Sequence, residues 1–374
     1  MTQYLKASSD DKQEIIDLID YVFSHEYTPH DFKKMLPKVY SDEVDGLGAE
    51  HYIARENGSI RAVVATRIVD MVLYGKRLKT GFIGSVAVHP ESRGAGYMKI
   101  LMNYAEEDAK RLGVQLLLLS GKRQRYGFFG FENAGILYQF NISSANVRHA
   151  LAEVDASLIS SHPLTDDPEE VRFVWELNNR KPCHAERNED EILRIMSSWT
   201  EPCSVVCKNG CPIGYCYGSF KELVLKDEAD FPAVLKALFP SDKDSVYIPV
   251  ASHERKRIEY LSSICEDYNL RHNEKACVLD WKAVLYTLLS LKAEHTTLRN
   301  GSKRFLIDDR YCFSVSVRNG RVSVKDAKPN RKTVKLEHND AERLFFELDG
   351  LLAGRERYGN WFPLPFYIDA ADTF

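Results

Sequence analysis

Residues 85–97 read SVAVHPESRGAGY, a run of apolar residues followed by a proline, an arginine and two glycines. The apolar part predicts a strand that ends at Pro90, because proline cannot donate to a strand ladder. Gly94 and Gly96 permit a tight turn into a helix, whose first backbone N–H groups then point outward at its positive end. Such a turn is suited to bind a pyrophosphate. The alternative is a glycine-containing turn that binds no ligand.

Elements of a mixed α/β domain flank this turn. A helix is predicted over residues 12–23, where apolar residues recur at helical spacing. Asn57-Gly58 lies between two apolar runs, which is the strongest short signal for a hairpin. The predicted strands cover residues 51–56, 60–69, 71–74, 82–88 and 114–119, and a second helix covers residues 95–112. This order predicts a mixed sheet flanked by helices.

Tyr126 stands in a second glycine-rich and aromatic stretch, GKRQRYGFFGF at residues 121–131. A phenol with a pKa of about 10 is a suitable proton donor to a thiolate whose pKa is about 8.5 or above. The alternative is a buried aromatic side chain with a satisfied hydroxyl group. The three phenylalanines of the stretch, Phe128, Phe129 and Phe131, are predicted to lie in the core.

The pattern V-x-V-x-P-x-x-R-G-x-G at residues 86–96 resembles motif A of the GNAT acetyltransferases, and Y-x3-G-F at residues 126–131 resembles their motif B. The resemblance implies that acetyl-CoA is the co-substrate and that the tyrosine protonates the departing thiolate. It implies that the backbone of residues 86–88 pairs with the pantetheine arm and that residues 93–99 hold the pyrophosphate. These residues are Val86, Ala87, Val88, Arg93, Gly94, Ala95, Gly96, Tyr97, Met98 and Lys99. Met98 departs from the Gly or Ala that is usual in the family.

A chain of 374 residues is too long for one ordinary core. We predict a catalytic GNAT domain over residues 1–150, a degenerate GNAT-like domain over 151–278, and an α+β domain over 279–374. The second unit repeats the strand, Asn-Gly turn and strand order, but residues 251–257 after its later strand contain no glycine. We therefore expect it not to bind CoA. The third unit is predicted to hold a helix over 281–291, strands over 304–307, 311–317 and 321–325, a helix over 341–352 and an aromatic tail.

This architecture resembles the enhanced intracellular survival (Eis) family, in which tandem GNAT domains precede a sterol-carrier-protein-like domain. The resemblance implies that the terminal carboxylate, here on Phe374, enters the first active site and acts as general base. A carboxylate in a partly desolvated cleft can accept the proton of an attacking amine. The alternative is a tail that only packs between domains, and Thr373 departs from the aromatic pair found in the family. Relatives form hexamers, which makes a homo-oligomer an expectation here.

Composition narrows the classes of partner. The formal net charge of −4 argues against nucleic acid as the main partner. No apolar run reaches the roughly 18 residues needed to span a bilayer, and the first residues lack a signal-peptide core. We therefore expect a cytoplasmic protein without a membrane partner.

The eight cysteines all lie at or beyond Cys183. The spacings of Cys203, Cys207, Cys211 and Cys216 lack the paired C-x2-C knuckles of zinc sites. We expect reduced, buried thiols and no metal, with a metal site or a disulfide as the alternatives.

The sequence therefore predicts an acetyl-CoA-dependent N-acetyltransferase that acetylates a primary amine, on a small molecule or a peptide, by direct transfer in a ternary complex. No covalent acyl-enzyme is needed, because no cysteine lies in the first 182 residues and no Ser-His-Asp motif is evident. The alternative is a non-catalytic regulator that binds CoA or another ligand on a GNAT scaffold. Four acidic residues are candidates to attract a cationic acceptor, with a solvated surface charge as the alternative for each: Glu26, Asp31, Asp369 and Asp372.

Overall fold

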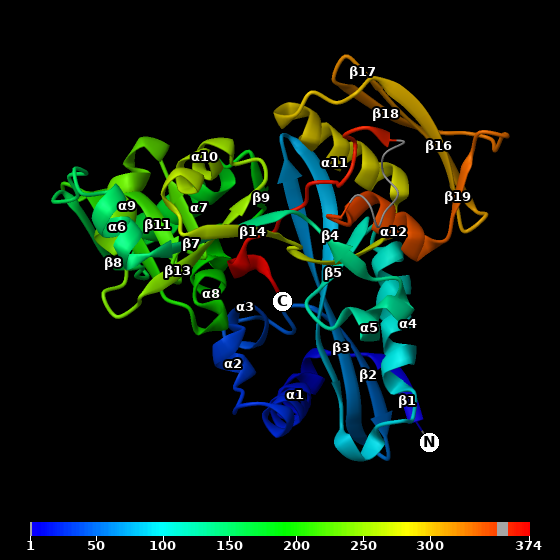
Figure 1. Ribbon diagram of the computed structural model, residues 1–374. Helices are drawn as coiled ribbons and strands as arrows, with labels where there is room; N and C mark the ends of the chain where they lie inside the picture. Colours follow the sequence, from blue (N-terminus) through cyan, green and yellow to red (C-terminus); the bar gives the residue numbers. More distant parts are fainter. Residues whose placement is uncertain (1, 350–357) are drawn as a thin grey trace.

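The computed structural model describes residues 2–349 and 358–374 and arranges them as three units (Figure 1). The first is a large sheet flanked by helices, the second holds two small sheets, and the third is a four-stranded sheet with two helices. The predicted α/β class is confirmed. The C-terminal segment runs back from the third unit and ends between the first and the second (Figure 1). Within the described residues, no helix has both the length and the apolar character to cross a bilayer.

The first unit is built on one sheet in the order β1-β2-β3-β4-β5-β15-β6, and β9 pairs with the end of β3. Its strands are β1 (Thr2–Lys6), β2 (Glu50–Glu56), β3 (Ser59–Leu73), β4 (Lys76–Val88), β5 (Leu116–Leu119), β6 (Glu132–Ala134), β9 (Cys183–Ala185) and β15 (Glu274–Val278). Its helices are α1 (Lys12–Glu26), α2 (Phe32–Met35), α3 (Pro37–Tyr40), α4 (Tyr97–Arg111) and α5 (Arg123–Tyr126). The predicted turn at Asn57-Gly58 is confirmed, with φ values of 51° and 89°. The predicted break between residues 69 and 71 is wrong, because β3 pairs with β4 continuously from Asp70 to Leu73.

Two helices cover the two faces of this sheet. On α1, Ile15, Ile16 and Ile19 are buried in one hydrophobic cluster. On α4, Leu101, Met102 and Ala105 are buried in a second cluster with residues of β2 and β3. Both helices thus present the apolar stripe that their sequences predict, and each stripe packs on its own face of the sheet.

The sheet opens beside the free end of β4. β4 and β5 run parallel and pair from Thr80 and Leu116 to Ile83 and Leu119, where β5 ends. β4 continues to Val88, and a bulge lies in this extension because Ser85 and Val86 together face one residue of β3. Beyond Ile83, the edge of β4 that faced β5 has no neighbouring strand among the described residues, so its backbone groups are available to a ligand.

The second unit contains the sheets β12-β11-β10-β8 and β13-β7-β14. Its strands are β7 (Leu137–Ser143), β8 (Ile159–Pro163), β10 (Cys203–Lys208), β11 (Cys211–Tyr217), β12 (Glu222–Leu225), β13 (Ser245–Ala251) and β14 (Asp267–Arg271). Its helices are α6 (Ser144–Ala150), α7 (Pro168–Asn179), α8 (Ile192–Met196), α9 (Phe231–Leu238) and α10 (Arg255–Ile264).

Two strands near the predicted boundaries at residues 150 and 278 pair in the sheet of the neighbouring unit. β7 precedes the first boundary but lies between β13 and β14 of the second unit. Conversely, β15 precedes the second boundary but lies between β5 and β6 of the first unit. The two units are therefore joined by shared sheets as well as by a linker.

The third unit consists of α11 (Trp281–His295), α12 (His338–Phe346) and the sheet β18-β17-β16-β19. Its strands are β16 (Gly301–Ile307), β17 (Tyr311–Arg318), β18 (Arg321–Asp326) and β19 (Val334–Leu336). α12 begins three residues earlier than predicted and ends at Phe346, so the predicted helix 341–352 is wrong for residues 347–349. Residues 350–352 of that prediction fall outside the described residues. The likeness of the third unit to a sterol-carrier domain stays a prediction.

Candidate active site

The turn between β4 and α4 has the geometry of an anion site. Gly94 and Gly96 have φ values of 85° and 80°, a region that glycine adopts without strain. Gly96 is the N-cap of α4 and has no side chain to accept hydrogen bonds from the first-turn amides. A Cβ added at either glycine would meet no protein atom within 4 Å, so open space lies in front of both. The turn therefore presents the positive end of a 15-residue helix to that space.

A cavity of about 500 Å³ lies in front of this turn. Of the ten residues predicted to bind the cofactor, eight line it: Val86, Val88, Arg93, Gly94, Gly96, Tyr97, Met98 and Lys99. Ala87 does not, because its side chain is buried on the α1 face of the sheet, and Ala95 is absent from the wall as well. The Tyr97 hydroxyl lies 3.2 Å from the Thr2 hydroxyl, so Tyr97 offers the cavity its backbone rather than its hydroxyl group.

Two side chains at the cavity differ from expectation. Arg93 forms an ion pair with Glu26 at the end of α1, so a phosphate would have to compete with this carboxylate. Phe128 was predicted to be core but is 70% exposed, with the Lys99 ammonium 5.0 Å from its ring centroid. Phe131 is buried as predicted. The sequence cannot separate these phenylalanines, because residues 123–129 form two short helical turns that point neighbouring side chains in different directions.

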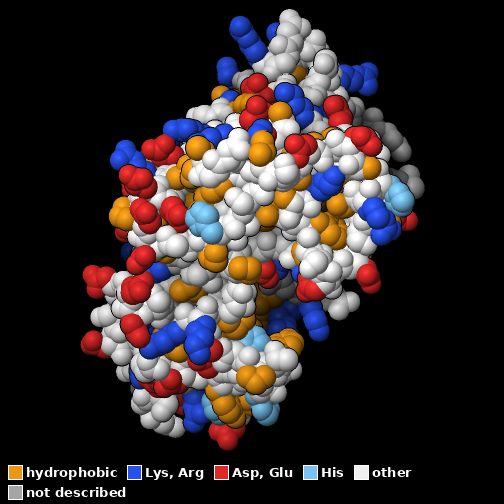
Figure 2. Space-filling model, turned by 90° about the vertical axis from the view of Figure 1, so that its left-hand side faces the viewer, with side chains coloured by type: hydrophobic (Ala, Val, Ile, Leu, Met, Phe, Trp, Pro, Cys, Tyr) orange, Lys and Arg blue, Asp and Glu red, His pale blue; other side chains and the backbone are white. Residues whose placement is uncertain are grey.

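A second cavity, of about 300 Å³, contains both predicted catalytic residues. Tyr126 and Phe374 line it, and it shares Val22, Glu26, Val86 and Arg125 with the first cavity. After the roles predicted for their residues from the sequence, we call the first cavity the cofactor cavity and the second the acceptor cavity. Figure 2 views the molecule from the side of the second unit and shows a recess below that unit, with hydrophobic side chains inside it.

Tyr126 is 7% exposed and is positioned by packing. A Cβ at Gly121 would lie 2.5 Å from Cε2 of its ring, so the ring takes the place of a side chain there. Burial raises the pKa of the Tyr126 hydroxyl, and the neighbouring Arg125 opposes this effect. The phenol therefore stays protonated at neutral pH, the state required of a proton donor.

The bulge in β4 is held by a buried hydrogen-bond network. The Tyr40 hydroxyl donates to Ser85 Oγ at 2.7 Å, and His51 Nε2 lies 3.0 Å from the same hydroxyl. Ser85 has a φ of 48°, which is unusual for a residue other than glycine. Burial lowers the pKa of His51 to about 4, so this ring is neutral near pH 7. The network stabilises the strained conformation at the point where the two cavities meet.

Phe374 is buried against the bulged strand. A Cβ added to Gly84 would lie 2.7 Å from Cγ of the Phe374 ring, so this ring occupies the space that a side chain at Gly84 would need. The Lys38 ammonium donates to the carbonyl oxygens of Ala371 and Thr373, each at 2.6 Å. Burial lowers the pKa of Lys38 well below its ordinary value. Trp199 Nε1 also donates to Thr373 Oγ1 at 3.1 Å.

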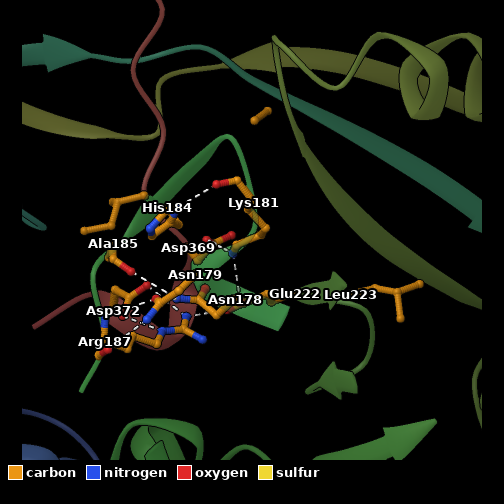
Figure 3. Close-up of polar contacts among 12 residues, drawn as sticks. Asn178, Asn179, Lys181, His184, Ala185, Arg187, Glu222, Leu223, Asp369 and Asp372 are labelled. Carbon is orange, nitrogen blue, oxygen red and sulfur yellow. Dashed lines mark hydrogen bonds and ion pairs between the residues drawn. The ribbon is translucent and has the colours of Figure 1, made fainter. Parts of the chain in front are cut away.

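A buried ion network in the second unit holds the segment before Phe374 (Figure 3). Arg187 is fully buried and donates to both oxygens of Asp372, at 3.0 and 2.9 Å, and to Glu222 at 2.9 Å. Lys181 pairs with Asp369 at 2.7 Å and with Glu222 at 3.2 Å. Burial opposes the charge of Arg187, but Asp372 and Glu222 outweigh it and raise the pKa of the guanidinium well above its ordinary value.

The four acidic candidates for attracting an acceptor are therefore engaged elsewhere. Asp372 and Asp369 are in the buried network, Glu26 pairs with Arg93, and Asp31 pairs with Lys34 at 2.8 Å. The expectation that they draw a cation into the site is not supported by this geometry.

Two residues from beyond the predicted catalytic domain reach the site without any sequence signal. Trp199 lines the acceptor cavity from a turn after α8. Glu274 on β15 accepts a hydrogen bond at 2.8 Å from Ser120, which lines the same cavity. Burial raises the pKa of the Glu274 carboxyl to about 7, although the Ser120 hydrogen bond opposes it. Neither could be found from spacing, because both are brought in by the arrangement of the units.

The corresponding turn of the second unit, between β13 and α10, lines a separate cavity of about 760 Å³. Arg257 at the start of α10 is buried and paired with Glu228 and Glu254. Five of the eight cysteines are buried, and they include Cys203, Cys207 and Cys216 of the four for which buried thiols were predicted. Cys211 is exposed instead, because it follows the tight Asn209-Gly210 turn.

Comparisons with known proteins agree with this geometry. A family model described as an acetyltransferase (GNAT) domain matches residues 3–134. No curated protein matches the sequence. Among solved structures, a probable N-acyltransferase from Enterococcus faecalis V583 is 14% identical, with full coverage of both chains and a TM-score of 0.68. A GCN5-related N-acetyltransferase from Kribbella flavida is 14% identical, with 100% of this chain and 98% of that chain covered and a TM-score of 0.69.

Eis1 from Mycobacterium abscessus is also similar, at 14% identity and a TM-score of 0.66, again with full coverage of both chains. At this level of identity the three structures show a shared fold. Residues 3–134 thus match the model of the GNAT acetyltransferase domain, and the chain as a whole shares its fold with Eis1 and the other two structures.

Proposed function

We propose that the protein is an N-acetyltransferase that moves the acetyl group of acetyl-CoA to a primary amine by direct transfer. The observation that carries this proposal is the junction of two cavities. One lies at an uncapped helix N-terminus, and the other holds a buried tyrosine. Val86 lies on both walls, at the bulge of the strand that β5 leaves unpaired.

Acetyl-CoA would bind across this junction. Its pyrophosphate would accept hydrogen bonds from the amides of Gly94, Gly96, Tyr97 and Met98, where the helix dipole favours negative charge; the amides of Ala95 and Lys99 already donate to backbone carbonyl groups. Its pantetheine arm would pair with the free backbone of Val86, Ala87 and Val88, as a strand does. The thioester would then lie at the bulge, next to the acceptor cavity.

Tyr126 would donate its proton to the leaving thiolate. We propose the α-carboxylate of Phe374, which lines the same cavity, as the base that takes the proton from the amine. The reaction forms one amide bond and breaks one thioester bond. The amine proton leaves to the base, and the thiolate takes the phenol proton.

Glu274 is the competing base. Its carboxyl has a pKa near 7 and reaches the acceptor cavity only through Ser120. A Glu274→Gln variant separates the two assignments, because it keeps the hydrogen-bonding shape and removes the titration. If Glu274 is the base, the acidic limb of the kcat/KM profile near pH 7 disappears together with most of the activity. If Phe374 is the base, the profile stays.

The acceptor cavity favours an amine on an apolar body. Aromatic side chains make up much of its wall, and the acidic residues nearby are paired. The aromatic residues are Phe23, Tyr27, Phe32, Tyr126, Trp199 and Phe374. Lys122 and Arg125 lie on the same wall and disfavour a polycation. We therefore propose an arylalkyl or alkyl monoamine as the acceptor, in preference to a polyamine.

The experiment measures thiol release from acetyl-CoA with 2-phenylethylamine, hexylamine, spermidine, an aminoglycoside and a lysine peptide. Thiol release that matches amide formation, fastest with the two monoamines, supports both proposals. Faster turnover of the polycations would contradict the acceptor class only. Stoichiometric CoA binding with no thiol release from any amine would contradict the enzyme and favour a CoA-binding regulator.

A further inference from the structure

Three side chains of the types that bind transition metals meet where α12 crosses β15. Cys277 lies on β15, and His338 and Glu342 lie one turn apart on the same face of α12. His338 Nε2 is 3.5 Å from Cys277 Sγ and 3.4 Å from Glu342 Oε1. One ligand atom from each residue lies within 4.8 Å of the other two. Within the described residues, this is the one group of three or more such side chains.

The hydrogen bonds within this group leave it incomplete. Glu342 is fully buried, and its Oε1 accepts a hydrogen bond from the backbone N–H of Val278 at 2.6 Å. Its Oε2 is also buried and has no hydrogen-bond partner. A buried carboxylate oxygen without a partner is costly. A cation bound to this carboxylate would lower that cost, because it compensates the negative charge that Oε1 and Oε2 share.

The surroundings of His338 resemble the outer shell of a metal site. His338 Nδ1 lies 3.8 Å from one carboxylate oxygen of Asp308, and the backbone N–H of His338 donates to the other at 2.8 Å. A carboxylate on the far side of the imidazole is the arrangement found behind metal-binding histidines, and at 3.8 Å it acts here by electrostatic attraction without a hydrogen bond. Trp281 packs edge-on against the ring, with centroids 5.1 Å apart. The Nε2 atom is thereby aimed at Cys277 and Glu342.

We propose that Cys277, His338 and Glu342 bind a zinc ion. Thiolate, imidazole and carboxylate are the ligands that zinc uses in proteins, at about 2.3 Å from sulfur and about 2.0 Å from nitrogen or oxygen. Ligands at those distances around a tetrahedral centre lie about 3.3–3.6 Å apart, which agrees with the two separations. Binding releases the Cys277 thiol proton to solvent, and a water molecule completes the fourth position.

The site would brace the loop that carries Tyr126. A Cβ added to Gly130 would lie 3.1 Å from the His338 ring and 3.2 Å from Cys277 Sγ, so the loop packs directly on the site. The neighbouring Asn339 donates to the carbonyl oxygen of Gly127 at 2.9 Å. Zinc would thus tie the third unit to β15 immediately behind this loop. The ion acts as a structural ligand in this proposal and takes no part in acetyl transfer.

The test uses the full chain, loaded with zinc and then dialysed, with metal content measured by mass spectrometry. We expect one zinc per chain in the wild type and a loss of most of it in Cys277→Ser and in Glu342→Gln. Cys183→Ser is the matched control, because Cys183 is buried on β9 and is not part of the group. It should bind zinc like the wild type.

Cobalt gives a second readout that needs no variant. Cobalt added to the chelator-treated wild type should give the near-ultraviolet charge-transfer absorption of a cobalt–thiolate bond. Zinc should also raise the unfolding temperature of the chelator-treated wild type. A wild type with zinc well below one per chain, no charge-transfer absorption and no thermal shift would overturn the proposal and leave a hydrogen-bonded triad. Equal zinc content in the wild type and Cys277→Ser would also overturn it.

Discussion

Gly84→Ala tests the placement of the C-terminal residue with the smallest change the chain allows. The new methyl carbon would lie 2.7, 2.8 and 3.0 Å from three atoms of the Phe374 ring. Carbon atoms in contact prefer about 3.5–4.0 Å, so the ring must move by about 1 Å. Overpacking of a buried contact costs about 1–3 kcal/mol. Replacing glycine where the backbone tolerates alanine recovers about 0.4–1 kcal/mol, so the net loss of unfolding free energy should be about 1–2 kcal/mol.

The same displacement should slow the reaction. Misplacement of a catalytic group by about 1 Å can cost about 10²-fold in rate. If the Phe374 carboxylate is the base, kcat should fall by about 10–10²-fold. The acetyl-CoA affinity should hold, since the amides of residues 94–99 are untouched. Steady-state kinetics and calorimetric titration measure the two quantities separately.

A double-mutant cycle attributes the effect to this pair of residues. Phe374→Ala removes the ring and keeps an α-carboxylate, at a cost of about 3 kcal/mol or more for the lost burial. In that background Gly84→Ala should be neutral or slightly stabilising, because nothing opposes the methyl group. The coupling energy should then be about 1–3 kcal/mol by urea unfolding. A coupling near zero, or a Gly84→Ala protein with wild-type stability and kcat, would refute the placement of Phe374.

Gly96→Val should weaken acetyl-CoA binding by several kcal/mol in calorimetric titration, and Gly96→Ala, which carries the same backbone strain, should weaken it less. An equal loss of affinity in the two variants would contradict the pyrophosphate site. In the wild type, binding should saturate at one acetyl-CoA per chain. Tyr126→Phe should keep cofactor affinity and lower kcat by about 10²–10⁴-fold, and wild-type kcat would remove the tyrosine from the mechanism. Asp372→Asn should lower the free energy of unfolding by about 3–5 kcal/mol, because it leaves the buried Arg187 guanidinium with one carboxylate fewer. If the stability and the protease resistance of the C-terminal tail stay unchanged, the buried ion network does not hold this tail. Burial alone would raise the pKa of Asp108, but hydrogen bonds from Tyr52, Lys6 and Arg111 outweigh it and lower the pKa to about 2. This carboxylate should therefore stabilise the fold above about pH 4 and lose that contribution as the pH falls toward 2. When the free energy of unfolding is measured against pH, the Asp108→Asn variant should show a weaker dependence over this range.

Local signals in the sequence were sufficient to predict the glycine turn between β4 and α4. A strand that ends before a proline, two glycines and an amphipathic helix are properties of neighbouring residues, and each restricts the backbone within a few positions. For this reason residues 86–99 could be identified before the structure, as could the Asn57-Gly58 hairpin. Tyr126 followed because its stretch comes one strand later in the order expected of the fold.

The acceptor side of the site is a product of tertiary structure. Phe374 and Gly84 are 290 positions apart, and Asp372 meets Arg187 across 185 positions. The role of Phe374 was therefore inferred from a resemblance, and spacing gave no reason for its contact with Gly84. The four acidic residues were candidates to attract a cationic acceptor, because the sequence does not reveal the basic residues with which they form ion pairs.

The sequence by itself determined the elements, the glycine turn at residues 94–96 and the order of units, since these depend on short-range conformational preferences. Only the tertiary structure decided that β7 and β15 exchange between sheets and that Glu274 and Trp199 reach the acceptor cavity. It alone brought Cys277 to His338 and Glu342, 61 and 65 positions further along the chain. The physical reason is that burial and ion pairing between distant segments depend on how whole units pack, and no periodicity or spacing in the chain expresses that packing.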